Sequence, residues 1–271
     1  MAEYSLALSE AEVARYRQMA ETALKDEREL WNAAGVRPGA RIADVGCGPG
    51  AISIVLARIV GSRGYVQGVD RDLAAVSTAR RLAARVGLTN VRFRQGDADA
   101  TGLGPGSMDV VMMRHVLAHN GGHERSIVGH LASLARPGGC VYLVDIDAEG
   151  IRSEPVIPVL EDLNTAYRAL HARRGNDLSV GLRLGELLAG AGLEAVEVHE
   201  RPQVLTSRPG LRPPAWAARE LLVAEGLATR ERVEEWGAAF ERLDREGPRF
   251  DLFLSQYCAL GRRPAGDAAA G

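Results

Sequence analysis

The sequence predicts an α/β fold in which a doubly wound parallel sheet carries helices on both faces. Apolar, strand-like runs alternate with amphipathic runs of helical spacing between residues 40 and 147. A glycine-rich turn, "DVGCGPG" at 44–50, joins the first such strand to the first such helix. Strand–helix units that repeat in this way build a parallel sheet with right-handed crossovers. The 271 residues suffice for one large domain, or for a domain with a cap.

The first element is a helix that precedes the sheet. Ser9 and Glu12 have the spacing of a capping box, and Leu8 and Val13 have that of a hydrophobic staple. Apolar side chains then recur at helical spacing: Val13, Tyr16, Ala20 and Leu24. We therefore expect residues 1–36 to form an N-terminal helical lid.

The alternation that follows supplies the sheet. Asp72 is a good N-cap for the second helix of the alternation, and "RPGG" ends the third. The expected strands span 40–46, 65–70, 91–97, 108–114 and 140–147, and the expected helices span 50–60, 72 onward and 123–135.

The pattern loosens after residue 150. We expect a helix within 155–175, a helix and then a strand within 182–205, two helices within 213–243 and a last strand in 249–264. This predicts a main domain that spans 37–263, with a core of 37–149, 178–204 and 249–263. The cap insertions are 150–177 and 205–246, and the tail, 264–271, is expected to be disordered.

Composition excludes several functional classes. The formal net charge is −2, so no overall basic field attracts nucleic acid, and no apolar run is long enough to span a membrane. The first residues lack the basic flank and apolar block of a signal peptide. Cys47, Cys140 and Cys258 are far apart, which favours a reducing compartment and no zinc site. We therefore expect a cytoplasmic protein that uses neither membrane nor nucleic acid as a partner.

The turn at 44–50 predicts a ligand that approaches the backbone closely. Gly46-x-Gly48-x-x-Ala51 fits the dinucleotide fingerprint, but Asp44 lies beside the turn, where a carboxylate would repel a pyrophosphate and attract an ammonium group. Asp70 ends the second strand, at the place where an acid accepts hydrogen bonds from ribose, and Asp97 ends the third, where it can accept from an adenine amine.

This set of strand ends resembles the class I S-adenosylmethionine-dependent methyltransferases of the bacterial small-molecule type, related to quinone biosynthesis and natural products. The motifs that carry the resemblance, over 37–149, are "DVGCGPG", "VDRD", "GDAD", "MDVVMMRHVL" and "ARPGGCVYLVD". The resemblance implies a Rossmann-like sheet of seven strands whose last strand is antiparallel. It also implies S-adenosyl-L-methionine as the cofactor.

The resemblance further implies roles for individual residues. Asp44 would serve the methionine end of the cofactor, Gly46 and Gly48 the close backbone approach, Asp70 the ribose, and Asp97 with Ala98 the adenine. Arg114 would contact the cofactor through its backbone, with its side-chain role open. We also include three neighbouring residues in the cofactor site: Tyr16, Cys47 and Arg71.

Methyl transfer from a sulfonium is an in-line displacement that needs alignment and exclusion of water, and a base only for some acceptors. His115 and His119, in "RHVLAHN", are the candidate catalytic residues because they follow the fourth strand. Two histidines at this spacing can also bind a metal, but no third ligand is evident, so we expect no metal. Packing roles for both histidines stay open.

The small-molecule acceptor should contact the lid and the insertions. Tyr16, His115, Trp216 and Trp236 are the candidate acceptor-binding residues, although a tryptophan on an amphipathic helix is more often part of a core. The sequence leaves the oligomeric state open, with a homodimer held by N-terminal helices as one option.

Two other functions stay open. An NAD(P)-dependent oxidoreductase would share the glycine turn and the ribose acid, but it leaves Asp44 and "GDAD" unexplained. A non-catalytic interaction protein that binds S-adenosylmethionine would keep every cofactor position and lack transfer activity.

Overall fold

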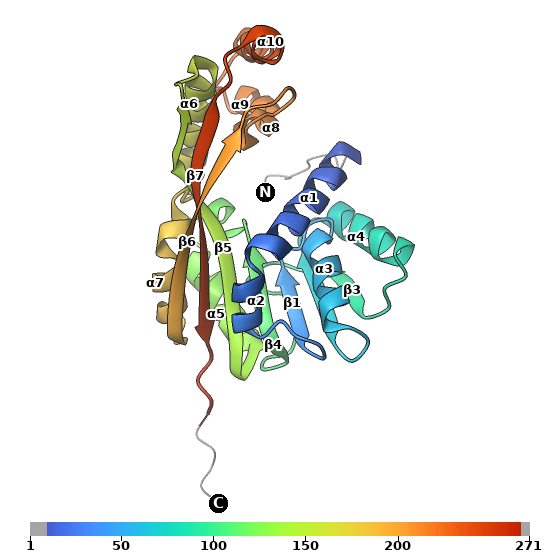
Figure 1. Ribbon diagram of the computed structural model, residues 1–271. Helices are drawn as coiled ribbons and strands as arrows, with labels where there is room; N and C mark the ends of the chain where they lie inside the picture. The colour runs from blue at the N-terminus through green and yellow to red at the C-terminus, as the bar shows by residue number, and fades with distance from the viewer. Residues whose placement is uncertain (1–9, 267–271) are drawn as a thin grey trace, which may run out of the picture.

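The computed structural model describes residues 10–266, with side chains from residue 13 onward. Leu8, Ser9 and the side chain of Glu12, for which a capping box and a staple were predicted, lie outside the described residues, as does most of the predicted tail. The described chain forms one seven-stranded sheet with helices on both faces, as the sequence predicts (Figure 1).

The strand order is β3-β2-β1-β4-β5-β7-β6. The pairs among β1 to β5 are parallel, and β7 is antiparallel to both β5 and β6, which confirms the expected antiparallel last strand. The strands are β1 (Arg41–Val45), β2 (Tyr65–Asp70), β3 (Val91–Gln95), β4 (Met108–Arg114), β5 (Ala135–Glu154), β6 (Glu194–Thr206) and β7 (Asp251–Arg262).

Because β2 and β4 lie on opposite sides of β1, the chain leaves β1 and β4 in opposite directions. A crevice at such a point, outside the carboxyl ends of the strands, is where open α/β sheets bind ligands. The glycine turn after β1 and the histidines after β4 both lie at this edge.

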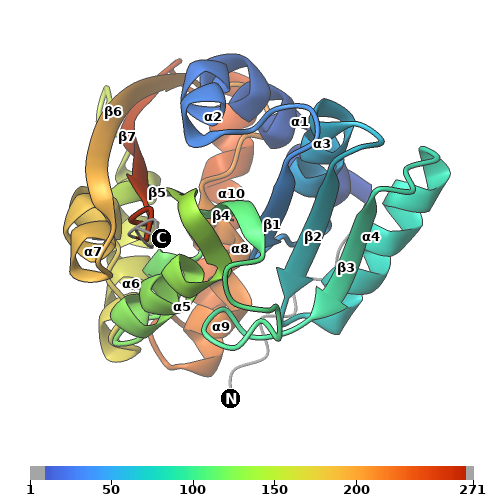
Figure 2. The same cartoon turned by 90° about the horizontal axis from the view of Figure 1, so that it is seen from below.

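Helices cover both faces of the sheet. α2 and α3 lie on one side and α5 on the other (Figure 2). The helices are α1 (Glu10–Asp26), α2 (Arg28–Ala34), α3 (Ala51–Val60), α4 (Leu73–Arg85), α5 (Glu124–Leu134), α6 (Pro158–Arg173), α7 (Leu184–Gly190), α8 (Pro214–Ala217), α9 (Arg219–Ala224) and α10 (Arg230–Glu246), with 3₁₀ turns η1 (Leu117–His119) and η2 (Val180–Arg183).

The strands alternate between two cores, as their period of two requires. On β1, Ile42 packs with the α2, α3 and α4 side chains, and its neighbour Ala43 packs with those of α5 and α7. Asp72 caps α4 as predicted, because its carboxylate accepts from the Ala74 N–H at 2.8 Å.

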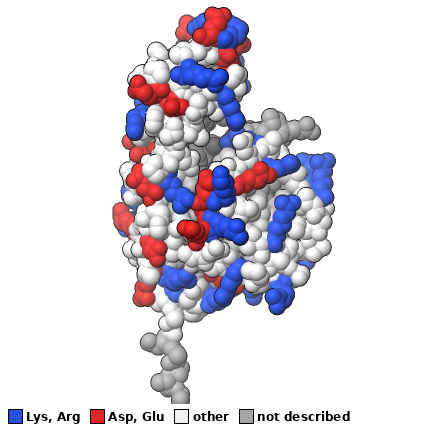
Figure 3. All heavy atoms as spheres, viewed as in Figure 1, with Lys and Arg blue, Asp and Glu red and all other residues white. Residues whose placement is uncertain are grey.

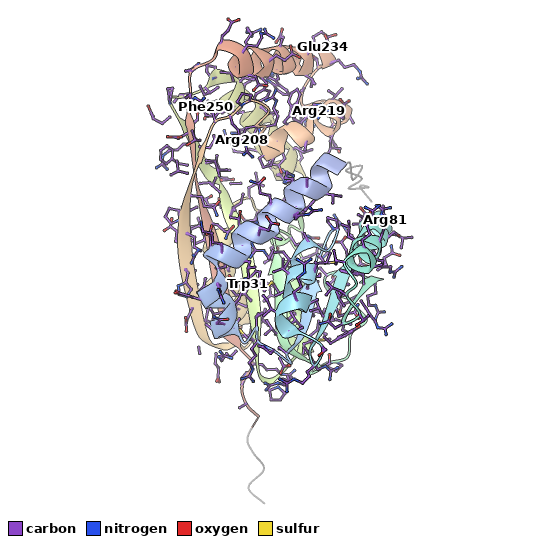
Figure 4. All side chains as sticks on the ribbon, turned by 45° about the vertical axis from the view of Figure 1, so that its right-hand side comes forward. Trp31, Arg81, Arg208, Arg219, Glu234 and Phe250 are labelled. Atoms are coloured by element: carbon purple, nitrogen blue, oxygen red, sulfur yellow. The ribbon has the colours of Figure 1, made fainter. Side chains whose placement is uncertain are left out.

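A third hydrophobic cluster forms the cap, which stands above the carboxyl edge of the sheet in Figure 1. Its buried residues come from both predicted insertions, for example Leu163 from α6 and Trp236 and Phe240 from α10. Phe250, labelled in Figure 4 within the cap, directly precedes β7 and belongs to the same cluster. The two insertions therefore share one core although 205–246 is distant in sequence from 150–177.

Three strands continue from the sheet into the cap, which the sequence did not indicate. β5 was expected at 140–147 but runs to Glu154, because it resumes pairing with β7 after an irregularity between Asp147 and Arg152. The boundaries predicted at 149/150 and 204/205 therefore fall within β5 and β6. The sequence predicts two helices in 213–243, but the structure has three. The helical segments are interrupted between α8 and α9 and again before Thr229, the N-cap of α10.

The N-terminal helices are fastened to the sheet by one buried carboxylate. Glu27, between α1 and α2, is 2% exposed. It accepts hydrogen bonds from the Arg114 guanidinium, from Tyr142 Oη at 2.8 Å and from Gln256 Nε2 at 2.9 Å. The Trp31 indole, on α2 (Figure 4), donates at 3.2 Å. The donors come from β4, β5, β7 and α2.

These donors decide the charge of Glu27. Burial opposes ionisation, but the Arg114 guanidinium and the hydrogen bonds of Tyr142 and Gln256 outweigh it and hold the pKa of Glu27 below its ordinary value. The carboxylate is therefore ionised at neutral pH, and the stability that it contributes is lost as the pH falls through this lowered pKa.

In the described part of the chain, no helix combines the length and the apolar character that a membrane span requires.

We predict that Glu27→Gln lowers the free energy of unfolding at pH 7 by about 3–5 kcal/mol, because it leaves the buried Arg114 guanidinium without a counter-charge. Urea denaturation measures this. Glu186→Gln is the matched control: it removes exposed ion pairs with Arg125 and Arg183 and should change stability by less than about 0.5 kcal/mol. Equal effects of the two substitutions would contradict a structural role for the Glu27 network.

Candidate functional site

The turn after β1 needs glycine because another loop lies directly against it. Gly46 has φ +76°, and a Cβ built there would lie 2.3 Å from Val116 Cγ2. Its N–H donates to the Val69 carbonyl at 2.8 Å. A Cβ on Gly48, with φ +52°, would meet nothing nearer than Tyr16 Cε1 at 3.9 Å. Glycine at position 46 therefore allows two loops to pack closely, and glycine at position 48 allows a left-handed backbone conformation beneath α1.

Asp70, at the end of β2, is bound to the same turn. Its Oδ2 accepts from the Gly48 N–H at 2.8 Å and its Oδ1 from the Asp72 N–H at 2.9 Å. The carboxylate is thus oriented at the carboxyl edge of the sheet, beside the turn. Arg71 is exposed, and its carbonyl accepts from Gln95 Nε2 at 3.0 Å.

Asp44, at the end of β1, is 2% exposed, and Ser53 Oγ donates to its Oδ2 at 2.5 Å. Burial raises the pKa of Asp44 to about 6, against the opposing effects of the Ser53 hydroxyl and the Arg114 charge. A buried carboxylate with a raised pKa favours a cationic partner, since a positive charge nearby restores the ionised form.

The remaining cofactor candidates lie around these two acids. Asp97 is exposed after β3, where its carbonyl accepts from the Ala100 N–H at 3.1 Å, and Ala98 is half-buried. Cys47 is buried, and burial raises the pKa of its thiol well above the ordinary value, so it offers no thiolate. The structure brings the ends of β1, β2 and β3 to one edge of the sheet, as the sequence predicts.

Arg114 ends β4, and its side chain has the structural role that the sequence left open. It forms the buried ion pair with Glu27. His115, the next residue, has φ +54°, a conformation that side-chain-bearing residues seldom adopt. The His115 N–H donates to the Val144 carbonyl of β5 at 2.8 Å, which keeps the loop attached to the sheet.

His119 belongs to η1, whose backbone donates a hydrogen bond to a buried carboxylate that sequence reasoning missed. Asp145, on β5, is 1% exposed and accepts from the Ala118 N–H at 3.3 Å and from its neighbour Ile146 at 3.0 Å. Burial raises the pKa of Asp145 to about 6. An acid within the apolar strand "CVYLVDID" was the available signal, because a buried acid needs donors.

Burial lowers the pKa of both predicted catalytic histidines. The value for His115 falls to about 3, with burial as the first cause and the Arg114 charge as the second. The pKa of His119 is lowered by burial and by Arg71. Both imidazoles are therefore neutral at physiological pH.

Two residues of the cap join His119, and sequence reasoning missed them as well. His171, on α6, has its ring centroid 5.2 Å from that of His119 and 4.3 Å from that of Tyr167. Asn176 Nδ2 lies 3.0 Å from His171 Nδ1. No local signal distinguishes Tyr167 and His171 from other residues at helical spacing, since only the docking of the cap brings α6 to η1.

The other acceptor-binding candidates separate in space. Tyr16 is partly buried over the glycine turn. Trp236 is 3% exposed within the cap, and its Nε1 donates to Asp162 Oδ2 at 2.7 Å. Trp216 packs edge-on against Phe240, at a centroid distance of 5.2 Å, in the same cluster. The two tryptophans therefore hold the cap together, and the structure places Tyr16 and His115 at the glycine turn.

Among the described residues, no group of three or more His, Cys, Asp or Glu side chains is arranged to hold a metal ion.

Comparison with known proteins points to one family. Residues 37–192, more than half of the chain, match the family described as "Methyltransferase domain". The chain is 33% identical over 118 residues to an arsenite methyltransferase of Aquipseudomonas alcaligenes, covering 41% of this chain, and 39% identical over 74 residues to aklanonic acid methyltransferase DauC of Streptomyces sp., covering 27%. Each alignment spans 34% of the relative's own length.

Solved structures share the fold at lower identity. The YcgJ protein of Bacillus subtilis aligns with a TM-score of 0.58 and 20% identity, over 91% of this chain and 100% of that one. At this identity the likeness shows the fold alone.

We predict that Gly46→Ala destabilises the protein more than Gly48→Ala. Both substitutions force alanine into a left-handed conformation at about 1–2 kcal/mol, and only the first adds overpacking against Val116, at about 1–3 kcal/mol. Urea denaturation in wild-type and Val116→Ala backgrounds checks this: shortening Val116 should reduce the excess cost of Gly46→Ala. Equal costs of the two glycine substitutions in both backgrounds would refute the contact between the turn and the His115–Val116 loop.

Proposed function

The chain belongs to the methyltransferase domain family, and from this we propose that it transfers a methyl group from S-adenosylmethionine to a small-molecule acceptor. The observation that carries the proposal is the position of Asp44 and Asp70 at neighbouring strand ends on either side of the glycine turn. One carboxylate suits an ammonium group, and the other suits ribose hydroxyls. The family match favours this function over an NAD(P)-dependent oxidoreductase.

The residues present fit this cofactor. Asp44 would face the amino group of its methionine part, Asp70 its ribose, and Asp97 with Ala98 its adenine, while Gly46, Cys47 and Gly48 supply the close backbone. Tyr16, Arg71 and the backbone of Arg114 complete the proposed contacts. S-adenosylmethionine supplies a methyl group already activated by a sulfonium charge, so the chain's work is to orient and to exclude water.

His115 and His119 are the proposed residues on the acceptor side of this site. Both imidazoles are neutral, and the loop that carries them touches the glycine turn through Val116. A neutral imidazole orients an acceptor hydroxyl by hydrogen bonding, and its lowered pKa makes it a weak base. We infer that the acceptor oxygen or carbon is acidic enough to react with little help from a strong base.

The cysteines argue against arsenite, which one relative's name gives as its substrate. Trivalent arsenic is thiophilic, and soft centres require thiolate ligands. Cys47, Cys140 and Cys258 are all buried, and burial raises the pKa of each thiol, that of Cys140 to about 11. We therefore propose an organic acceptor, as in the relative whose name gives aklanonic acid, and we propose that the reaction belongs to natural-product biosynthesis.

The setting of the reaction is also a proposal. We infer a cytoplasmic enzyme because its three cysteines are unpaired thiols. Acidic and basic side chains both occur on the face of the molecule in Figure 3, which agrees with the net charge of −2 and with a small-molecule acceptor in place of nucleic acid. A homodimer remains an option that gel filtration would test.

Calorimetric titration with S-adenosylhomocysteine, and separately with NADH and NADPH, tests the proposed function. Binding of S-adenosylhomocysteine alone supports it. Binding of a nicotinamide cofactor alone would indicate hydride transfer in place of methyl transfer. Binding of none of the three ligands would favour a non-catalytic role.

We predict that Asp70→Ala weakens the binding of S-adenosylhomocysteine by about 1–3 kcal/mol, because the ribose hydroxyls lose a half-buried hydrogen-bond acceptor. Calorimetry measures the affinity. Asp72→Ala is the matched control: it removes the cap of α4, which is worth about 1 kcal/mol of stability, and should leave the affinity unchanged. Unchanged affinity in Asp70→Ala would remove the ribose assignment.

We predict that the affinity for S-adenosylhomocysteine falls about tenfold per pH unit below pH 6. In the free protein Asp44 has a pKa of about 6, so below this pH the ammonium group meets a protonated acid that must first ionise. Affinity should therefore rise from about pH 5 to 7, in which range the ligand itself does not titrate.

Two variants identify the group responsible for this pH dependence. Asp44→Asn should bind more weakly at pH 7 and with little pH dependence. Asp145→Asn removes the other carboxyl whose pKa is raised to about 6 and should keep the wild-type dependence. A pH dependence that survives in Asp44→Asn would exclude Asp44 as its source.

A further inference from the structure

The cap and the loop after β4 meet in a tight contact between two glycines. A Cβ on Gly121 would lie 1.8 Å from the Gly175 carbonyl oxygen, so the backbone of the η1 loop touches the backbone after α6. Asn120 Nδ2 donates to the Val116 carbonyl at 2.7 Å, which joins this contact to the residue that packs on Gly46. A continuous set of contacts thus leads from the glycine turn to α6.

Asn176 fixes which ring nitrogen of His171 carries the proton. The Gly121 N–H, which can only donate, lies 3.0 Å from Asn176 Oδ1, and this identifies the amide oxygen. The amide nitrogen Nδ2 therefore faces His171 Nδ1 at 3.0 Å and donates to it. With Nδ1 as acceptor, a neutral His171 carries its proton on Nε2.

His171 stays neutral at physiological pH. Burial is the first cause and the nearby His119 and Arg174 are the next, and together they lower its pKa to about 4. His171 is 5% exposed, and no described residue accepts a hydrogen bond from its Nε2. The ring therefore offers one oriented N–H donor next to His119 and Tyr167.

We propose that His171, oriented by Asn176, donates an Nε2–H hydrogen bond to an oxygen of the methyl acceptor, and that Tyr167 and His171 select a planar acceptor. This assigns acceptor recognition to α6. The inference rests on the proposed function, because it takes the bound molecule to be the methyl acceptor. The binding itself is measurable without methyl transfer.

The chemistry of the cluster narrows the acceptor class. The rings of Tyr167 and His171 meet edge-on, at 61°, and that of His119 is tilted by 48° from His171. Aromatic side chains favour flat, apolar ring systems, and a single N–H donor favours a carbonyl or phenol-type oxygen on such a ring. Neutral imidazoles offer no charge for a phosphate or a carboxylate, so the predicted acceptor is a planar, uncharged or phenolic oxygen compound.

The test compares 1-indanone with indane, two flat molecules that differ in one carbonyl oxygen. Nitrogen-detected NMR of the histidine rings first reports the tautomer of His171, with the proton expected on Nε2. Titration with each probe, with and without saturating S-adenosylhomocysteine, should then shift the His171 Nε2 signal with 1-indanone only. A preference for 1-indanone over indane of about two- to tenfold is expected from one neutral hydrogen bond.

Two substitutions test whether the preference for 1-indanone over indane depends on His171. His171→Phe should remove it and should bind S-adenosylhomocysteine as the wild type does. His199→Phe is the matched control, because His199 is an exposed histidine on the edge strand β6 and its replacement should keep the preference.

Asn176→Asp keeps the His171 ring and reverses its tautomer. The aspartate still accepts from Gly121, but its second oxygen also accepts, so His171 must protonate Nδ1 and its pKa rises. His119, Arg174 and Tyr167 face the ring and are unchanged. The preference for 1-indanone should therefore vanish above the new pKa and persist below it, where the imidazolium still carries Nε2–H.

Three results would overturn the proposal: a proton on Nδ1 in the wild type, equal or absent responses of the His171 ring to the two probes, or an unchanged preference in His171→Phe. A wild-type protein that discriminates the probes but fails to bind S-adenosylhomocysteine would refute methyl transfer and leave the recognition by His171 in place.

Discussion

The buried carboxylate of Glu27 is the constraint on which the placement of the site depends. It is ionised beneath the N-terminal helices because donors from β4, β5, β7 and α2 converge on it. Arg114 is the strongest of these partners, and it directly precedes His115. The same ion pair therefore fixes α1 over the glycine turn and fixes the end of β4 from which the histidines follow. A desolvated charge has no alternative partner nearby, so these elements have one mutual arrangement.

Around this anchor the site combines two kinds of buried titratable group. The acids Asp44 and Asp145 have raised pKa values, and the histidines His115, His119 and His171 have lowered ones. Burial is the first cause in every case, and at neutral pH it leaves the three imidazoles uncharged while the two acids, with pKa values of about 6, are mostly ionised. A cationic, flat ligand therefore meets a carboxylate that attracts its positive charge and rings that carry no charge.

The cap provides the proposed acceptor side by tertiary contact alone. Its hydrophobic cluster unites 150–177 with 205–246, and three strands carry it from the sheet to a position above the strand ends. Gly121 and Gly175 bring its helix α6 against the η1 loop. In this way residues more than fifty positions apart, such as His119 and His171, face each other at ring distance.

The sequence by itself determined the sheet, its glycine turn and the acids at its strand ends, because strand period, helix caps and turn glycines are local properties. Asp72 capped its helix as its spacing required, and the ends of β1, β2 and β3 met because parallel strands share a carboxyl edge. Only the tertiary structure decided the partner of Arg114, the buried role of Trp236, the extension of β5 into the cap and the meeting of His119 with His171. Each of these depends on which distant segment packs against the residue, and a side chain's local spacing carries no information about a partner brought to it by the docking of a separate hydrophobic cluster.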